Sequence, residues 1–181
     1  MSWNENHTDL TYNNYKYHYD MIKWRMAETL IQELFLACHF DVFHYGMENT
    51  IPGIMDLLKW IRSDVAQDIK KAPDFVIHNR ATRAVYFAEI KFRASRYFSI
   101  QDVNKGYPPH QEYPYHNAYF IVVSKKDIKC LSYEELKSGE KISPESDNHI
   151  EDRKEFNLNK EVVAHFCKFA GQFFEWVNWE I

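Results

Sequence analysis

The chain has 181 residues, the length of one ordinary domain, and its 45% hydrophobic and 27% charged residues are the balance of a globular protein, which excludes a disordered chain. No run of about 18 apolar residues occurs, which excludes a membrane-spanning helix of ordinary hydropathy, and the formal net charge is −4. The three cysteines, Cys38, Cys130 and Cys167, have neither disulfide-framework nor zinc-ligand spacing, so a reducing, cytoplasmic setting is expected.

The first part of the chain predicts two helices with a strand between them. Residues 1–20 are a polar extension, and residues 24–38 form a helix with one apolar stripe, because their hydrophobic side chains recur at helical spacing. In residues 39–46 apolar and polar side chains alternate, which predicts a short strand. Pro52 suits the first turn of a second helix, whose apolar face spans residues 54–65.

The rest of the chain predicts four strands and two helices. Apolar and β-branched runs mark the strands, which are expected at residues 75–77, 83–92, 118–124 and 128–131. A small helix at residues 133–137 ends before Gly139, and residues 141–154 are polar and expected to be mobile. The final helix has an apolar stripe that consists of Val162, Phe166, Phe169, Ala170, Phe173, Phe174 and Val177.

Three charged residues lie in or beside the predicted strands. Asp74 directly precedes one strand, and Glu89 and Lys91 lie two residues apart in the next, so the last two side chains point to the same face. If the two strands pair as a hairpin, two carboxylates and an ammonium group converge. Neighbouring carboxylates repel each other unless a cation lies between them, and oxygen ligands suit Mg²⁺ or Mn²⁺. The pattern therefore indicates a metal-dependent phosphodiesterase site.

A simpler interpretation is that Glu89 and Lys91 form a surface pair, since short charged triplets near a Pro-Asp pair arise by chance. The surrounding strand argues against a surface position, because its other residues are apolar or aromatic, namely Tyr86, Phe87, Ala88, Ile90 and Phe92. A charged pair in such a strand costs free energy unless it is satisfied, so it is more often functional than a charge at a loop tip. Coincidence in an unrelated α/β protein remains an open alternative.

The arrangement of Pro73-Asp74, fourteen further residues and Glu89-Ile90-Lys91 resembles the motif of the PD-(D/E)xK nucleases, which include restriction endonucleases and archaeal Holliday-junction resolvases. Residues 25–42 look like the helix and strand of the resolvase-like branch, in which a helical glutamate joins the metal site. Glu28 stands at the matching place. Glu28 and Glu33 flank opposite sides of the apolar stripe, so helical geometry alone leaves either of them open.

The resemblance implies an α/β fold with a restriction-endonuclease-like core, which is a central mixed β-sheet flanked by helices. This core would span about residues 24–131 of a single domain that covers residues 1–181. Residues 1–20 would be an N-terminal extension, and residues 155–181 an added C-terminal helix that is rich in aromatic side chains.

The resemblance also assigns roles to the site residues. It implies that Asp74 and Glu89 hold a Mg²⁺ ion, for which Mn²⁺ can substitute, and that Glu28 completes the metal shell or holds a second ion. On this resemblance the backbone carbonyl of Ile90 would be a further ligand, and Lys91 would position the attacking water. The implied reaction is hydrolysis of a nucleic-acid phosphodiester bond.

Two features depart from the family pattern. His39 replaces a glycine that is usual between the helix and the strand. The helix expected between the third and fourth core strands is not obvious, because residues 99–105 are short and a Pro-Pro pair follows them. These departures concern the subfamily and leave the charged triad intact.

A basic window suggests where a polyanion binds. Residues 70–105 contain eight basic and three acidic side chains, so they carry +5 while the remainder carries −9. Arg93 and Arg96 closely follow Lys91 and are expected to bind phosphates, and Lys105 belongs to the same window. Gln111 and the tyrosines of the loop at residues 107–116 are expected to contact bases. Alternatively, the aromatic side chains of that loop cover the edge of the core.

The sequence therefore predicts a metal-dependent nuclease, with DNA as the expected substrate. The alternative is a catalytically silent nucleic-acid-binding or assembly module with the same fold. An enzyme that cuts both strands of a duplex is normally a symmetric dimer, so a homodimer is an open expectation. No membrane partner is expected.

Overall fold

The computed structural model describes residues 6–45, 72–105 and 112–176, and for residues 6–14 only the backbone. The predicted helix around residues 52–65 lies outside this part of the chain. The described part contains four α-helices, one 3₁₀ turn and five strands. They are α1 (Asn6–Ala37), β1 (Phe40–His44), β2 (Phe75–Asn79), β3 (Val85–Phe92), α5 (Ile100–Asn104), β4 (Ala118–Val123), β5 (Ile128–Ser132), α6 (Tyr133–Lys137), the 3₁₀ turn η1 (Ile150–Asp152) and α7 (Lys160–Trp176).

The described strands form one sheet in the order β1-β2-β3-β4-β5. All neighbours are antiparallel except β3 and β4, which are parallel. A parallel pair needs a crossover connection, and the chain between β3 and β4 contains the short helix α5. The expected α/β fold, with a mixed central sheet flanked by helices, is confirmed. The helix that was not obvious at residues 99–105 is α5, which has a capping box between Ser99 and Asp102.

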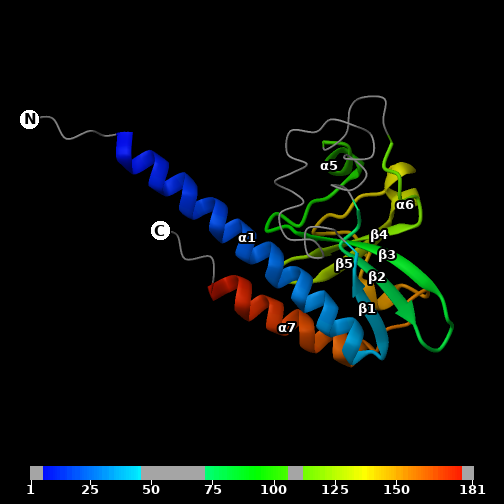
Figure 1. Cartoon of the computed structure of the whole chain (residues 1–181). Coiled ribbons are helices and arrows are strands. Elements are labelled where there is room, and N and C mark those ends of the chain that lie inside the picture. Colours follow the sequence, from blue (N-terminus) through cyan, green and yellow to red (C-terminus); the bar gives the residue numbers. More distant parts are fainter. Residues whose placement is uncertain (1–5, 46–71, 106–111, 177–181) are drawn as a thin grey trace, which may run out of the picture.

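Helices α1 and α7 lie side by side on one face of the sheet (Figure 1). The predicted apolar stripe of α1 is buried there, and its buried members are Ala27, Leu30, Ile31, Leu34 and Phe35. In α7 the buried residues are Val163, Ala170 and Phe174, and Phe174 stacks on Phe92 of β3 with 4.2 Å between ring centroids. Phe169, which the sequence placed in the stripe, is instead 49% exposed.

The opposite face of the sheet packs against α5 and α6. The second apolar cluster lies there and includes Phe98, Val103, Phe120, Val122, Tyr133 and Leu136. Side chains alternate along β3, so Ala88 and Ile90 face α1 and α7, whereas Phe87, Glu89 and Lys91 face the other side. The charged residues of β3 therefore project from the face that bears the smaller helices.

Helix α1 begins at Asn6, so it includes most of the predicted N-terminal extension. A prediction about local order further along the chain was wrong. Residues 141–154, which were expected to be mobile, are packed against the sheet, since Ile142 and Ile150 are buried and Phe98 pairs with Ile142. Buried side chains at these positions fix the segment.

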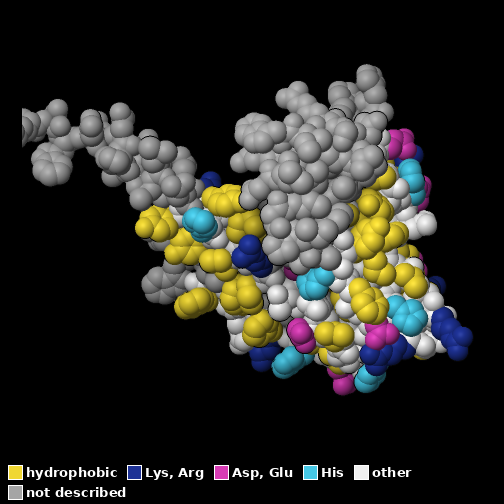
Figure 2. Space-filling view, in the orientation of Figure 1, with side chains coloured by type: hydrophobic (Ala, Val, Ile, Leu, Met, Phe, Trp, Pro, Cys, Tyr) yellow, Lys and Arg dark blue, Asp and Glu magenta, His cyan; other side chains and the backbone are white. Residues whose placement is uncertain are grey.

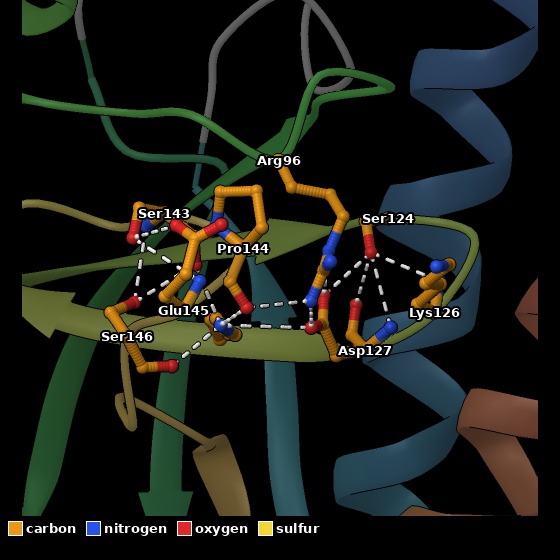
Figure 3. Close-up of polar contacts among 9 residues, drawn as sticks. Arg96, Ser124, Lys126, Asp127, Ser143, Pro144, Glu145 and Ser146 are labelled. Atoms are coloured by element: carbon orange, nitrogen blue, oxygen red, sulfur yellow. Dashed lines mark hydrogen bonds and ion pairs between the residues drawn. The ribbon is translucent and has the colours of Figure 1, made fainter.

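A buried lysine explains how the polar segment is held. Lys129 of β5 is 1% exposed, and its ammonium group donates to the carbonyl oxygens of Ser143 at 2.7 Å and Ser146 at 2.6 Å. Backbone oxygens thus satisfy a charge that would otherwise be costly to bury. Figure 3 shows these serines beside the ion pair of Arg96 and Asp127.

His39 occupies the junction between α1 and β1 with a φ of 66°. This left-handed conformation favours glycine, because a Cβ atom there is crowded by the backbone. His39, which replaces the usual glycine, therefore has a backbone conformation that glycine adopts most easily.

Candidate active site

The candidate site lies where β2 begins beside the middle of β3. Phe75 pairs with Ala88, and extending this antiparallel register by one residue brings Asp74 beside Glu89. Asp74 is 5% exposed, and its Oδ2 accepts a hydrogen bond of 2.6 Å from the backbone N–H of Ile90. The hairpin that the sequence required therefore forms, and it places the two carboxylates on one face.

The backbone of β3 is unusual at this point. Among the described strands, β2 pairs with β3 only up to Ala88, so Ile90 has no ladder partner on that edge. The Asp74 carboxylate takes the place of the missing acceptor. The N–H and C=O groups of one strand residue point to the same edge, so the carbonyl of Ile90 also points to the side where Asp74 lies.

Lys91 lies two residues after Glu89 on the same face. Its Nζ is 2.5 Å from Oε1 of Glu89 and 5.6 Å from the centroid of the Trp24 ring, which α1 supplies. The second oxygen of Glu89, Oε2, is buried and has no hydrogen-bond partner among the described residues. Lys91 is therefore held by a carboxylate and an indole face, while one buried acceptor atom remains unused.

Helix α1 brings a third carboxylate to the site. Glu28 lies one turn after Trp24 and is 8% exposed, whereas Glu33 is exposed to solvent. The charge of Glu28 raises the pKa of Asp74, so the two groups are close enough to interact. Of the two glutamates that the sequence left open, Glu28 is the buried one and its charge acts on Asp74, whereas Glu33 faces solvent.

The electrostatics of the cluster favour a bound cation. Burial raises the pKa of Asp74 well above its usual value, and the charges of Glu89 and Glu28 raise it further, against a smaller opposing effect of Lys91. Burial alone would lower the pKa of Lys91, but the carboxylates of Glu89 and Asp74 more than offset this and raise it. Lys91 therefore remains charged, and the carboxylates have more negative charge than one ammonium group neutralises.

The side chains of the site offer the kind of ligand atoms that bind a hard divalent cation. Asp74, Glu89 and Glu28 offer only oxygen atoms, which are the ligands that Mg²⁺ and Mn²⁺ prefer, and the unused oxygen of Glu89 is available to an ion. Within residues 6–45, 72–105 and 112–176, however, no three His, Cys, Asp or Glu side chains are already close enough to form a complete metal cage. Water molecules and substrate oxygens commonly supply the remaining ligands of Mg²⁺.

The residues predicted to bind nucleic acid differ in their surroundings. Arg93 is half-buried, its guanidinium lies 5.6 Å from the centroid of the Phe98 ring, and its charge acts on Lys91. Lys105 is exposed and pairs with Asp102 at 2.8 Å. Gln111 lies outside the described residues. Of the predicted phosphate ligands among the described residues, Arg93 is thus the one that lies next to Lys91 of the candidate site.

Arg96, another predicted phosphate ligand, is held by contacts within the protein. Its guanidinium pairs with both oxygens of Asp127 and donates to the carbonyl of Pro144 at 3.1 Å, as Figure 3 shows. Asp127 also accepts from the hydroxyl of Ser124 at 2.6 Å. An arginine held in this way joins the β4–β5 turn to the segment around Pro144, so its donors are used within the protein.

Trp24 is a site residue that the sequence prediction missed. It stands four residues before Glu28 in α1, so the two side chains lie on the same face of the helix. Once Glu28 was singled out, this spacing was a signal that could have identified Trp24. Its contact with Lys91 joins α1 to β3, and only the folded structure shows it.

Comparisons with known proteins include a likeness to one solved structure. No family model matches the chain, and the search of curated proteins found no match. A solved structure of the Holliday junction resolvase Hjc from the archaeal hyperthermophile Archaeoglobus fulgidus matches with 17% sequence identity and a TM-score of 0.37. The match covers 78% of this chain and 98% of that one. Separately, none of the described helices is long and apolar enough to cross a lipid bilayer.

Proposed function

We propose that the chain is a metal-dependent nuclease that hydrolyses phosphodiester bonds in nucleic acid, with DNA as its substrate. One observation carries the proposal: Asp74, Glu89 and Lys91 meet on one face of the β2–β3 hairpin, with Glu28 of α1 close to Asp74. Three carboxylates and one ammonium group in a largely buried place are costly for stability alone. Such clusters of perturbed ionisable groups are characteristic of catalytic sites.

The carboxylates are proposed to hold Mg²⁺, or Mn²⁺ in its place. Asp74 and Glu89 are the proposed ligands, with the Ile90 carbonyl and Glu28 as further ones, and the direction of the Ile90 backbone supports its inclusion. A divalent ion at such a site acts as a Lewis acid on a phosphoryl oxygen and makes a water molecule a stronger nucleophile. Its positive charge would also relieve the repulsion between Asp74 and its neighbours.

Lys91 and Arg93 are proposed to act on the substrate. Because Lys91 remains an ammonium group, it can hold the attacking water in place by hydrogen bonding and can neutralise negative charge on the phosphate in the transition state. Trp24 and Glu89 restrict where this amine lies. Arg93, two residues further on, is proposed to bind a neighbouring phosphate, which adds affinity without sequence specificity.

A nicking assay with matched variants tests the proposal. Lys91→Ala and Asp74→Asn are each expected to lower the Mg²⁺-dependent rate by about 10²–10⁴-fold, since each removes a group that acts on the reacting atoms. Lys168→Ala removes an exposed lysine of α7 and serves as the control for lost charge. Glu28→Gln and Glu33→Gln form a second matched pair, in which only replacement of the buried Glu28 should lower the nicking rate. Unchanged nicking by Lys91→Ala or Asp74→Asn would refute the proposal.

The second candidate is a nucleic-acid-binding module without catalysis. The observation that favours it is the lack of a complete three-ligand cage among the described residues, together with the close pairing of Lys91 and Glu89. Calorimetric titration with Mg²⁺ and Mn²⁺ separates the two candidates. Binding that is lost in Glu89→Ala supports the nuclease, whereas nucleic-acid binding with no metal binding supports the silent module.

A further inference from the structure

A group of one exposed and two partly buried aromatic rings borders the candidate site on the same face of the sheet. Tyr45, Phe87 and Tyr115 form this group, which we term the aromatic platform: the ring centroids of Tyr45 and Phe87 are 5.3 Å apart, those of Phe87 and Tyr115 are 5.2 Å apart, and those of Tyr45 and Tyr115 are 6.2 Å apart. Tyr45 is 41% exposed although it contacts both other rings. If Tyr45 only packed in the hydrophobic core, less of its surface would be exposed to solvent.

The platform is joined to the site through the sheet. His44 pairs with Phe75, so the next residues, Tyr45 and Asp74, are also neighbours, and the N–H of Tyr45 donates to the carbonyl of Asp74 at 2.9 Å. Phe87 precedes Glu89 by two residues on the same face of β3. The backbones of Tyr45 and Asp74 are therefore about one strand spacing, ~4.8 Å, apart. One nucleotide can span that distance with its phosphate at the site and its base on the rings.

The same sheet face continues as an apolar surface away from the site. Phe43 and Val85 lie on it and are 57% and 61% exposed. In Figure 2, hydrophobic side chains gather over the strands of the sheet, and basic side chains lie beyond them at the hairpin end. Arg83 is at that end, between β2 and β3, and is exposed, whereas the neighbouring Arg80 pairs with Asp41. The surface thus combines exposed apolar side chains with a basic end, as surfaces that bind a nucleic-acid strand do.

We infer that the aromatic platform binds an unpaired nucleobase and that the substrate reaches the site as a single-stranded segment. This inference rests on the proposed nuclease function of the neighbouring site. In a duplex the faces of the bases are stacked on one another and cannot contact tyrosine rings, so flat stacking requires an unpaired strand. Tyr45 is the most exposed of the three rings, and it packs against Phe87 in a tilted arrangement and against Tyr115 edge to face.

Binding without cleavage tests the inference separately from the enzyme activity. A single-stranded oligonucleotide that carries 2-aminopurine is titrated with the full chain in EDTA, and both its fluorescence quenching and its anisotropy are recorded. Tyr45→Ala should weaken single-strand binding by about 5- to 100-fold and abolish the quenching. Tyr45→Phe keeps the ring and should retain both. Tyr17→Ala, which removes a 63% exposed tyrosine from α1, is the matched control and should bind as the wild type does.

Several outcomes would overturn the inference. Equal losses of single-strand and duplex affinity in Tyr45→Ala would show that the ring has no stacking role, as would unchanged single-strand affinity or absent quenching in the wild type. Thermal melts of each variant identify a loss that comes from misfolding, and Tyr45→Leu then replaces the alanine variant. The two hypotheses fail in different ways. If the base stacks on the platform but Lys91→Ala nicks as fast as the wild type, only the nuclease site is refuted. If the wild type nicks in a metal-dependent way but no stacking is detected, only the platform is refuted.

Discussion

Trp24 and Lys91 lie 5.6 Å apart, measured from the indole centroid to Nζ, and they join helix α1 to strand β3. A cation over an aromatic face is stabilised by the ring quadrupole, and burial strengthens the effect. The contact also restricts the flexible lysine stem beside Glu89. An element far away in the sequence therefore positions the amine that is proposed to act on the substrate.

Trp24→Leu is expected to remove this restraint, whereas Trp24→Phe keeps an aromatic face. A double-mutant cycle with Lys91→Met, measured by urea unfolding, should give a coupling energy of about 0.5–2 kcal/mol for tryptophan against leucine. In the nicking assay Trp24→Leu should lower kcat with little change in KM, because substrate binding is not affected. Zero coupling, or a leucine variant with normal kcat, would show that the ring only fills space.

The hairpin and its charged residues could be predicted from the sequence because both depend on local rules. Alternation along the strand put Glu89 and Lys91 on one face, and the short distance in sequence to Asp74 allowed hairpin pairing. The dense β-branched and aromatic composition of β3 marked the strand clearly. The antiparallel β2–β3 and β4–β5 pairings then follow from short connections, and the parallel β3–β4 pairing follows from one crossover.

The features that sequence missed depend on contacts between distant residues. Arg96 seemed free to bind phosphate, but its partner Asp127 lies 31 residues away in sequence. Residues 141–154 appeared mobile because they are polar, and their order comes from the buried amine of Lys129, which reads from sequence as an ordinary surface lysine. Neither contact has a periodic or local pattern, so neither could be predicted from composition or spacing.

Asp74→Asn should change stability in opposite directions with and without metal. The buried Asp74 carboxylate is repelled by Glu89 and Glu28, so the neutral amide should stabilise the metal-free protein and raise its Tm in EDTA by about 2–4 °C, the shift that ~1 kcal/mol produces in a chain of this size. The amide oxygen can still accept from Ile90. Saturating Mg²⁺ should raise the Tm of the wild type and leave that of the variant almost unchanged. Thermal scans in EDTA and in Mg²⁺ measure both effects, and equal Mg²⁺ shifts in the two proteins would contradict the assignment of Asp74 as a ligand.

Arg93 and Arg96 should behave differently although both closely follow β3. If Arg93 binds a phosphate, Arg93→Met should reduce the slope of log affinity against log salt concentration by about 1. Arg96→Met should leave that slope unchanged and instead destabilise the fold, since Asp127 loses its partner. Binding titrations at several salt concentrations, combined with urea unfolding, give both quantities. A lower salt slope in Arg96→Met would restore the original expectation for that residue.

Asp127→Asn is expected to be most damaging near neutral pH. Burial raises the pKa of Asp127, but hydrogen bonds from Arg96 and Ser124 more than offset this, so its folded pKa lies below the usual 3.8. A carboxyl group with a lowered pKa stabilises the fold fully above its unfolded pKa, and this stabilisation is lost as the pH falls through the folded value. At pH 7 the variant should therefore be about 2–3 kcal/mol less stable, because the positive charges of Arg96 and the nearby Lys129 lose a negative partner.

Urea unfolding of both proteins from pH 7 down to pH 3 should show the difference in unfolding free energy shrinking below about pH 4. Asp152→Asn, at a pair that is exposed to solvent, is the control and should cost little at any pH. A difference for Asp127 that stays constant through the acid range would mean that shape, and not charge, holds Arg96 in place.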